Sequence, residues 1–489
     1  MSELIPDRLP DLIPDLIKDA RGRLSDFLTP SVRLGVTGLA RSGKTVFITA
    51  LVRNLVSGGR MPFFTPDAEG RIVRAYLEPQ PDDAVPRFDY EAHMACLEAG
   101  PPTWPESTRR VSELRVTIEY TSGSRLKRAL GLSKLHLDIV DYPGEWLIDL
   151  PLLNLDYEAF SGEALALARE DRRTAHAKPW LDFLAGTDPG AAEDERTALH
   201  GAKLFTEYLR RSREGEGQST LAPGRFLMPG DLDGSPLLTF FPMPLTSAAA
   251  PPKGSLAAMM IRRYESYKAQ VVRPFFHDHF SRLDRQIVLV DVLGALDKGG
   301  DALADLDRAM EGVLKAFRPG VNSWLSLLMG RRIEKVLFAA TKADHLPASS
   351  HDRLAGILKL IVETASERAE TEGAGVSALA IAALRATRES EIKSGKEILP
   401  CLRGTPLAGE RVGGTEFDGK TEAAIFPGDL PASPAAALDA ARHAKEGSLQ
   451  LVRFAPPRLK PKGTDTAAPA LPHIRLDRAL DFLIAEDLA

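Results

Sequence analysis

Cysteine is nearly absent from this sequence. Its 489 residues include only Cys96 and Cys401, too few and too far apart for a disulfide framework or a cysteine-rich metal cluster. No apolar run reaches the ~18 residues that a membrane-spanning helix requires, and no cleavable signal is recognisable. We therefore expect a protein of the reducing cytoplasm without a transmembrane segment.

An excess of charge of one sign is missing as well. The chain carries 62 basic and 67 acidic residues, which give a net charge of -5 and a pI near 6.1. Because nucleic-acid-binding domains usually present a basic surface, this balance argues against nucleic acid as the main partner. The length, about three times that of an average domain, predicts a large core with additions.

A phosphate-binding loop is the most informative feature that the sequence does contain. Residues 38–45 read Gly-Leu-Ala-Arg-Ser-Gly-Lys-Thr, between an apolar strand predicted over 32–37 and an apolar helix predicted over 46–55. The glycines let consecutive N–H groups point at phosphate oxygens, beside the positive end of the helix dipole. Lys44 would reach the β- and γ-phosphates, and the Thr45 hydroxyl would bind a magnesium ion. The predicted phosphate-binding residues are Gly38, Arg41, Ser42, Gly43, Lys44 and Thr45.

A second motif bears on the choice of base. Residues 341–344, Thr-Lys-Ala-Asp, follow an apolar run over 335–340 that is typical of a buried parallel strand. In this context the tetrad indicates guanine recognition, because the carboxylate accepts hydrogen bonds from the guanine N1 and N2 hydrogens, and adenine lacks these donors at that edge. A short loop after a strand predicted over 376–382 would contact guanine O6. The predicted base site comprises Thr341, Lys342, Asp344, Ala383 and Leu384.

A third motif, Asp-Tyr-Pro-Gly-Glu at 141–145, ends a predicted strand with alternating apolar residues. Asp141 would hold magnesium through water, and the Gly144 N–H would sense the γ-phosphate. Many GTPases place a glutamine after this glycine to orient the attacking water. Glu145 occupies that position here, so we expect slow intrinsic hydrolysis, with Lys44, Gly144 and Glu145 as the catalytic group.

A rival Asp-x-x-Gly motif begins at Asp291. We prefer Asp141 because residues 114–141 have the pattern of an antiparallel hairpin, and in small GTPases such a hairpin ends in the magnesium-binding aspartate. The apolar run at 287–290 then becomes the next strand of the core.

The metal site of a GTPase also uses a threonine from a mobile segment before the hairpin. Thr108 is our positional choice, with Thr103 as the second candidate, and the predicted metal ligands are Thr45, Thr108 and Asp141. Arg109 and Arg41 are candidate arginine fingers, although a solvated or phosphate-steering role is the simpler interpretation for both.

These motifs, together with Leu-Pro-His-Ile-Arg-Leu-Asp-Arg-Ala-Leu-Asp-Phe-Leu-Ile at 471–484, resemble the YcjX-like family of bacterial stress-associated P-loop GTPases over nearly the whole chain. The resemblance implies a soluble cytoplasmic protein of Gram-negative bacteria, with a GTPase-type core and large additions. Glu145 and Ala383 replace the glutamine and serine common in GTPases, which leaves the rate of hydrolysis and the tightness of guanine selection open.

We predict an α/β fold with a P-loop GTPase-type core, a mixed, mostly parallel sheet, a large helical insertion and a small β-containing C-terminal appendage. The expected parts are an N-terminal arm (1–30), the two parts of the core (31–149 and 284–390), the mainly helical insertion (150–283), and the appendage with a closing helix (391–489). We expect short strands in the appendage over 398–403, 422–426 and 449–454, and a closing helix that docks on the core.

The motifs predict a switch protein that binds GTP or GDP with Mg2+, hydrolyses GTP slowly and signals through the insertion to an unknown protein effector. Two alternatives stay open: an ATPase in which the tetrad at 341–344 is fortuitous, and a scaffold that holds nucleotide without turnover. Contact with a membrane surface is a further option, through the amphipathic segment 4–28 or a basic hairpin tip, although packing on the protein itself is the simpler interpretation. The basic residues of that tip are Arg125, Lys127, Arg128 and Lys134.

Overall fold

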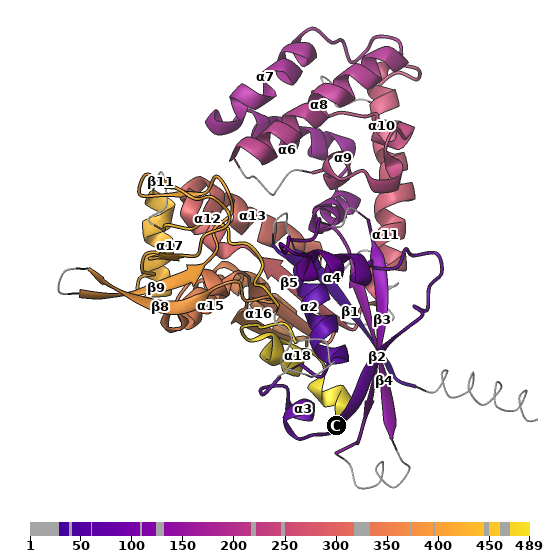
Figure 1. The fold of residues 1–489 in the computed structure, drawn as a ribbon. Helices are drawn as coiled ribbons and strands as arrows, with labels where there is room; N and C mark the ends of the chain where they lie inside the picture. The colour runs from indigo at the N-terminus through magenta and orange to yellow at the C-terminus, as the bar shows by residue number, and fades with distance from the viewer. Residues whose placement is uncertain are drawn as a thin grey trace, which may run out of the picture.

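The fold is built on a seven-stranded sheet with the strand order β2-β3-β4-β1-β5-β6-β7 (Figure 1). The computed structural model describes residues 29–38, 42–59, 61–107, 110–123, 132–216, 222–245, 250–316, 333–371, 373–394, 397–444, 449–459 and 470–489. The strands are β1 Ser31–Gly38, β2 Ile72–Glu78, β3 Ser112–Tyr120, β4 Ser133–Asp141, β5 Arg285–Val290, β6 Lys335–Ala340 and β7 Gly375–Ala380.

Six of these seven strands run in the same direction, and β3 runs opposite to them. β4, β1, β5, β6 and β7 pair in parallel, whereas β2, β3 and β4 pair antiparallel. This arrangement confirms the predicted α/β fold with a mixed, mostly parallel sheet, the hairpin of β3 and β4, and the placement of β5 beside β1. The edge strand β2 is an addition that the sequence analysis did not anticipate.

Apolar side chains cover both faces of the sheet, as expected for parallel strands. One face packs on α2 Lys44–Val56, α4 Tyr90–Glu98 and α18 Leu476–Ile484, and the short α3 Thr65–Ala68 lies near the chain's C-terminus. The other face packs on α12 Val292–Lys298, α13 Gly300–Ala316, α15 His351–Ile361 and α17 Pro434–His443. α16 Glu363–Thr371 follows α15 and contacts β7.

The segment between β4 and β5 is helical and rises away from the sheet (Figure 1). Its aromatic side chains belong to the same apolar cluster that covers one face of the sheet, with Trp180 stacked on Tyr208 and Phe160 stacked on Tyr264. A column formed by α10, η4 and α11 leads back from this region to the sheet. The elements are η1 Gly144–Asn154, α6 Tyr157–Ala168, α7 Asp171–Ala185, α8 Glu195–Glu216, α9 Gly224–Leu227, η2 Gly230–Leu232, η3 Pro236–Leu238, α10 Leu256–Tyr267, η4 Lys268–Val272, α11 Arg273–Asp278 and η5 Phe280–Arg282.

The C-terminal region contains two small sheets. β8 Arg388–Ser394, β9 Glu397–Gly404 and β12 Ala423–Ile425 form one, and β10 Arg411–Val412 pairs with β11 Thr415–Glu416 in the other. The prediction of a strand over 449–454 was wrong, because this segment makes only an isolated bridge between Phe454 and Pro406.

The closing helix packs on the core as predicted. Leu480, Leu483 and Ile484 are buried against the sheet, and α18 is followed by η8 Ala485–Leu488. Within the ranges that the structure describes, no helix combines the length and apolarity needed to cross a membrane. Of the basic hairpin tip, Lys134 bonds to Tyr76 and Glu119, and the other three residues lie outside the described ranges, as does segment 4–28.

Candidate nucleotide-binding site

The order of the sheet reverses at β1. From β1 the chain reaches β4 on one side, by way of β2 and β3, and later β5 on the other side. In open parallel sheets, ligands bind beyond the carboxyl ends of the strands at such a switch point. The carboxyl end of β1 is Gly38, the first residue of the phosphate-loop motif.

In that motif, Gly38 and Ser42 lie close together before α2. A side-chain carbon at Gly38 would lie 2.2 Å from the Ser42 hydroxyl and 2.9 Å from the Leu289 carbonyl oxygen, so only glycine fits there. Gly43 has a left-handed backbone, with φ 83°, and its carbonyl accepts the amide N–H of Phe47 at 2.9 Å in the first turn of α2. The sequence therefore places glycine at the two points where the backbone needs it.

Lys44 and Asp141 meet at this edge of the sheet. The register of β1 and β4 pairs Val36 with Asp141, which brings the end of β4 beside the loop. Lys44 Nζ lies 2.5 Å from Asp141 Oδ1, and the two side chains are only 11% and 1% exposed. A predicted phosphate-binding cation and a predicted metal ligand thus lie in direct contact.

The donor set fits magnesium. Thr45 is buried at the start of α2, and with Asp141 it offers a hydroxyl and a carboxylate, the hard oxygen donors that this ion prefers. In the described part of the chain, no three His, Cys, Asp or Glu side chains cluster as a metal site. An ion held by Thr45 and Asp141 would therefore take its other ligands from water and phosphate, which is usual for magnesium.

Gly144 and Glu145 begin η1, directly after β4. Arg213, near the end of α8, donates from Nη2 to Glu145 Oε1 at 2.6 Å. The intervening Tyr142 turns away into the core, where its hydroxyl donates to Gln286 Oε1 at 2.7 Å and burial raises its pKa well above the usual range. Glu145, which stands in place of the usual glutamine, thus forms an ion pair between the carboxyl edge of the sheet and the insertion.

Asp344 lies at the same edge, beyond the end of β6. Its Oδ2 accepts the Ala386 amide N–H at 2.9 Å, and its own carbonyl accepts the Thr387 hydroxyl at 2.5 Å. The Thr341 amide N–H donates to the Val290 carbonyl at 2.9 Å, which ties the tetrad to the end of β5. The backbone of the tetrad is thus tied to its neighbours, and one hydrogen bond restrains the Asp344 carboxylate.

Lys342 has a left-handed backbone with φ 62°, an uncommon conformation for a residue with a side chain. Its ammonium pairs with Asp291, the aspartate of the rival motif. Asp291 also caps α12 by accepting the Gly294 amide N–H at 3.0 Å. The structure therefore gives Asp291 contacts with Lys342 and α12, while Asp141 contacts Lys44.

The loop after β7 contains Ala383 and Leu384, the two residues predicted to contact guanine O6. Asp344 bonds to the amide of Ala386, just beyond Ala383 and Leu384. The Leu384 side chain is buried in the core on the α2 face of the sheet. A contact of Leu384 with guanine would therefore have to come from its backbone.

Three sequence-based candidates, Arg41, Thr108 and Arg109, lie outside the described residues. Thr103, the second choice for the metal, lies in a loop in which its amide N–H donates to the Cys96 carbonyl at 2.9 Å.

Sequence reasoning missed the residues that attach η1 to the insertion. Asp149 is fully buried and accepts hydrogen bonds from the Tyr267 hydroxyl at 2.6 Å and the Gly224 amide at 2.6 Å. Burial raises its pKa to about 6, although these bonds act in the opposite direction. A single carboxylate inside the apolar run 147–150 indicates a buried polar contact. The sequence does not identify the partners of that carboxylate.

Comparison with known proteins agrees with the architecture. The model of the YcjX-like family (DUF463) matches residues 32–488. The "Ras-like GTPase YcjX" of Escherichia coli strain K12 is 38% identical over 467 residues, covering 94% of this chain and 96% of that protein. The protein of the same name from Shewanella oneidensis MR-1 is 33% identical over 478 residues, covering 94% of each chain. The match thus extends from β1 to the closing helix, and the chain belongs to the YcjX-like family.

Proposed function

We propose that this protein is a guanine-nucleotide switch that binds GTP and GDP with magnesium and hydrolyses GTP slowly. The observation that carries the proposal is that the phosphate loop, Asp141 and Asp344 lie at the carboxyl ends of the parallel strands β1, β4 and β6 of one sheet, with the loop at its switch point. The names of the two relatives support the same activity.

Phosphate binding would rest on the loop amides and Lys44. The loop amides and the N-terminus of α2 favour anions, and Lys44 supplies a full positive charge. A bound triphosphate would compete with Asp141 for the Lys44 ammonium, while magnesium, held by Thr45 and Asp141, would neutralise part of the phosphate charge. Gly144 would donate its amide to the γ-phosphate.

Base selection would rest on Asp344. The Ala386 amide N–H bonds to one of its oxygens and restricts the carboxylate, which favours its acceptance of hydrogen bonds from guanine. An adenine at the same place would not supply the donors that guanine N1 and N2 offer to this buried carboxylate, which is unfavourable. Lys342 would pack its aliphatic stem along the base.

Slow hydrolysis follows from Glu145. In-line attack by water requires a group that orients the water, and the usual glutamine is replaced here by a carboxylate that already pairs with Arg213. The residues after Glu145 are held by the insertion through Trp146, whose indole N–H donates to the Met228 carbonyl at 3.2 Å, and through Asp149. We infer that residues 150–283 transmit the nucleotide state to an effector by way of η1.

The test is equilibrium binding of fluorescent GDP, ADP and xanthosine diphosphate to nucleotide-free protein in magnesium, with wild type and Asp344→Asn. We expect a strong GDP preference and a change of preference to xanthosine diphosphate in the variant, because Asn replaces one acceptor with a donor. Equal or stronger ADP binding that the substitution leaves unchanged would favour an ATPase instead. Single-turnover assays with GTP would then separate a slow GTPase from a scaffold that holds nucleotide without turnover.

A further inference from the structure

Arg213 of the insertion forms an ion pair with Glu145, the residue that follows the predicted γ-phosphate sensor Gly144. It lies near the end of α8, 68 residues along the chain from its partner Glu145. Their side chains are 24% and 9% exposed, so the ion pair is largely shielded from water. Leu209 and Ser212 are buried beside it, which fixes the end of α8 against the helical core.

The backbone of Glu145 is held by a second contact with the insertion. A side-chain carbon at Gly224 would lie 2.0 Å from the Glu145 carbonyl oxygen, so α9 begins in direct contact with this peptide. One residue on, the Arg225 guanidinium lies 3.1 Å from the centre of the Trp146 ring. With its backbone held by α9, the direction of the Glu145 carboxylate is set by Arg213.

The charge of this carboxylate matters only when a γ-phosphate is present. Glu145 follows Gly144, the predicted γ-phosphate sensor, so a triphosphate would bring its outermost negative charge close to it. A diphosphate lacks that group. An arginine that neutralises Glu145 should therefore favour the triphosphate and leave the diphosphate almost unaffected.

We propose that Arg213 is a positioning residue for the triphosphate: it neutralises Glu145 and holds its Oε1, so that the γ-phosphate can be accommodated and the carboxylate is oriented toward the attacking water. The inference rests on the proposed function and adds a part of the insertion to the site. It also lets the insertion act on the predicted phosphate site, since a movement of the end of α8 would separate Arg213 from Glu145 and leave the Glu145 charge unneutralised.

The test compares the affinities of GDP and of a non-hydrolysable GTP analogue for wild type, Arg213→Ala and Arg213→Lys. We expect Arg213→Ala to weaken the GTP analogue about tenfold relative to GDP, and Arg213→Lys, which keeps the charge, to recover part of that loss. Adding Glu145→Gln to Arg213→Ala should restore the wild-type ratio, because no charge is then left to neutralise. Arg211→Ala is the matched control, since Arg211 lies on the same turn of the helix and is 55% exposed.

Equal weakening of both nucleotides by Arg213→Ala, or no change in either, would overturn this inference alone. Failure of the wild type to bind any guanine nucleotide would overturn the proposed function and this inference with it. Thermal unfolding of each variant would establish that it is folded, and the ratio of two affinities in one protein is insensitive to a partly inactive sample.

Discussion

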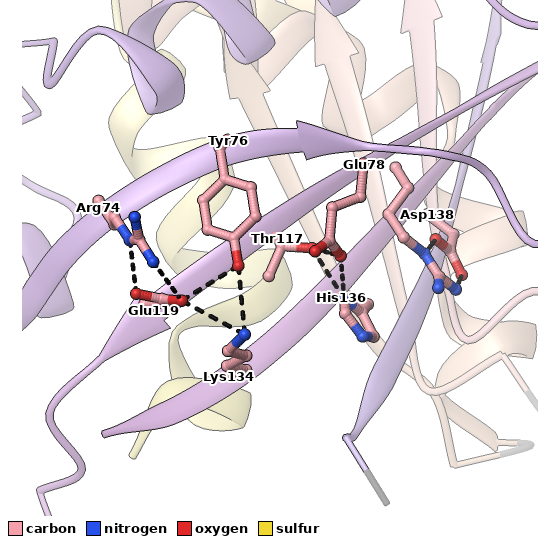
Figure 2. Close-up of polar contacts among 9 residues, drawn as sticks. Arg74, Tyr76, Glu78, Thr117, Glu119, Lys134, His136 and Asp138 are labelled. Atoms are coloured by element: carbon pink, nitrogen blue, oxygen red, sulfur yellow. Dashed lines mark hydrogen bonds and ion pairs between the residues drawn. The ribbon is translucent and has the colours of Figure 1, made fainter. Parts of the chain in front are cut away.

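Charged side chains pair in two different ways on this sheet. On the polar face of β2, β3 and β4, they pair between neighbouring strands (Figure 2): Arg74 Nε donates to Glu119 at 2.6 Å, and these residues are direct partners in the strand register. Thr117 donates to Glu78 at 2.5 Å and contacts the ring of His136, its own register partner. Alternation along the strands puts all of these side chains on one face.

At the carboxyl edge, by contrast, the pairs join segments that are far apart in the chain. Lys44 contacts Asp141, Glu145 contacts Arg213, and strand register does not impose the second of these contacts. The charges of the polar face satisfy one another within the sheet, whereas those of the edge include the residues predicted to contact phosphate and metal. We therefore expect changes on the polar face to alter stability, and changes at the edge to alter ligand binding.

The largest effect should come from Lys44→Ala at the edge. Loss of a shielded cation that contacts phosphate should weaken GDP binding about a hundredfold or more. Lys134→Ala is the control, because Lys134 is a lysine of the polar face, bonded to Tyr76 and Glu119. Titration with fluorescent GDP measures the affinity of both variants. A similar loss of affinity in the two would contradict the proposed difference between the edge and the polar face.

On the polar face, a substitution should lower stability and leave GDP binding unchanged. Asp138 is 2% exposed and binds Arg115 through both oxygens, at 2.6 and 2.8 Å. Asp138→Ala leaves this guanidinium without its carboxylate and should cost about 2 kcal/mol in the free energy of unfolding, with GDP affinity unchanged. Urea denaturation tests this, and Glu91→Ala, which breaks an exposed pair with Arg87, should cost less than ~1 kcal/mol.

The sequence predicted the parts of this molecule whose signals are local. β5 and β6 are continuous apolar runs, and the loop before α2 has glycine where the turn demands it, so fold and phosphate loop were both recognisable. β2 was not predicted because it is an edge strand with a polar face. Its Val73 is 53% exposed, so the strand has too few buried residues to show an apolar alternation. Edge strands often lack the apolar alternation that identifies central ones.

The contacts between the edge and the insertion could not be predicted for a different reason. Arg213 is one of several arginines at the end of α8, and its local pattern does not distinguish it from Arg211. Its partner, like those of Asp149, is tens of residues away in the sequence and is brought close only by tertiary packing. For segment 449–454, in contrast, a strand was predicted that does not form. Its apolar residues are typical of a strand, but the segment pairs only at Phe454.

The smallest of these effects is a difference in pH response between the two regions. Burial raises the pKa of Asp149 to about 6, whereas the ion pair with Arg74 lowers the pKa of Glu119 to about 2. A raised pKa means that the folded protein binds the proton more tightly than the unfolded chain. The stability that Asp149 contributes is therefore present at low pH and lost as the pH rises through about 6. For Glu119 the stability is present above the ordinary glutamate pKa and lost only as the pH falls toward 2.

Asp149→Asn should therefore gain stability relative to wild type as the pH rises from 5 to 7.5, by about 1 kcal/mol, since a neutral amide has no charge to bury. The Asn oxygen can still accept the Gly224 amide, so the contact between η1 and α9 is kept. Glu119→Gln should show a constant difference from wild type over the same range, because Glu119 stays ionised in both states throughout it. Urea unfolding at the two pH values tests both, and a pH-independent difference for Asp149→Asn would show that Asp149 is already ionised in the folded protein at pH 5. In that case the bonds from Tyr267 and Gly224 would outweigh burial, and η1 would be attached to the insertion through a charged carboxylate held by two neutral donors.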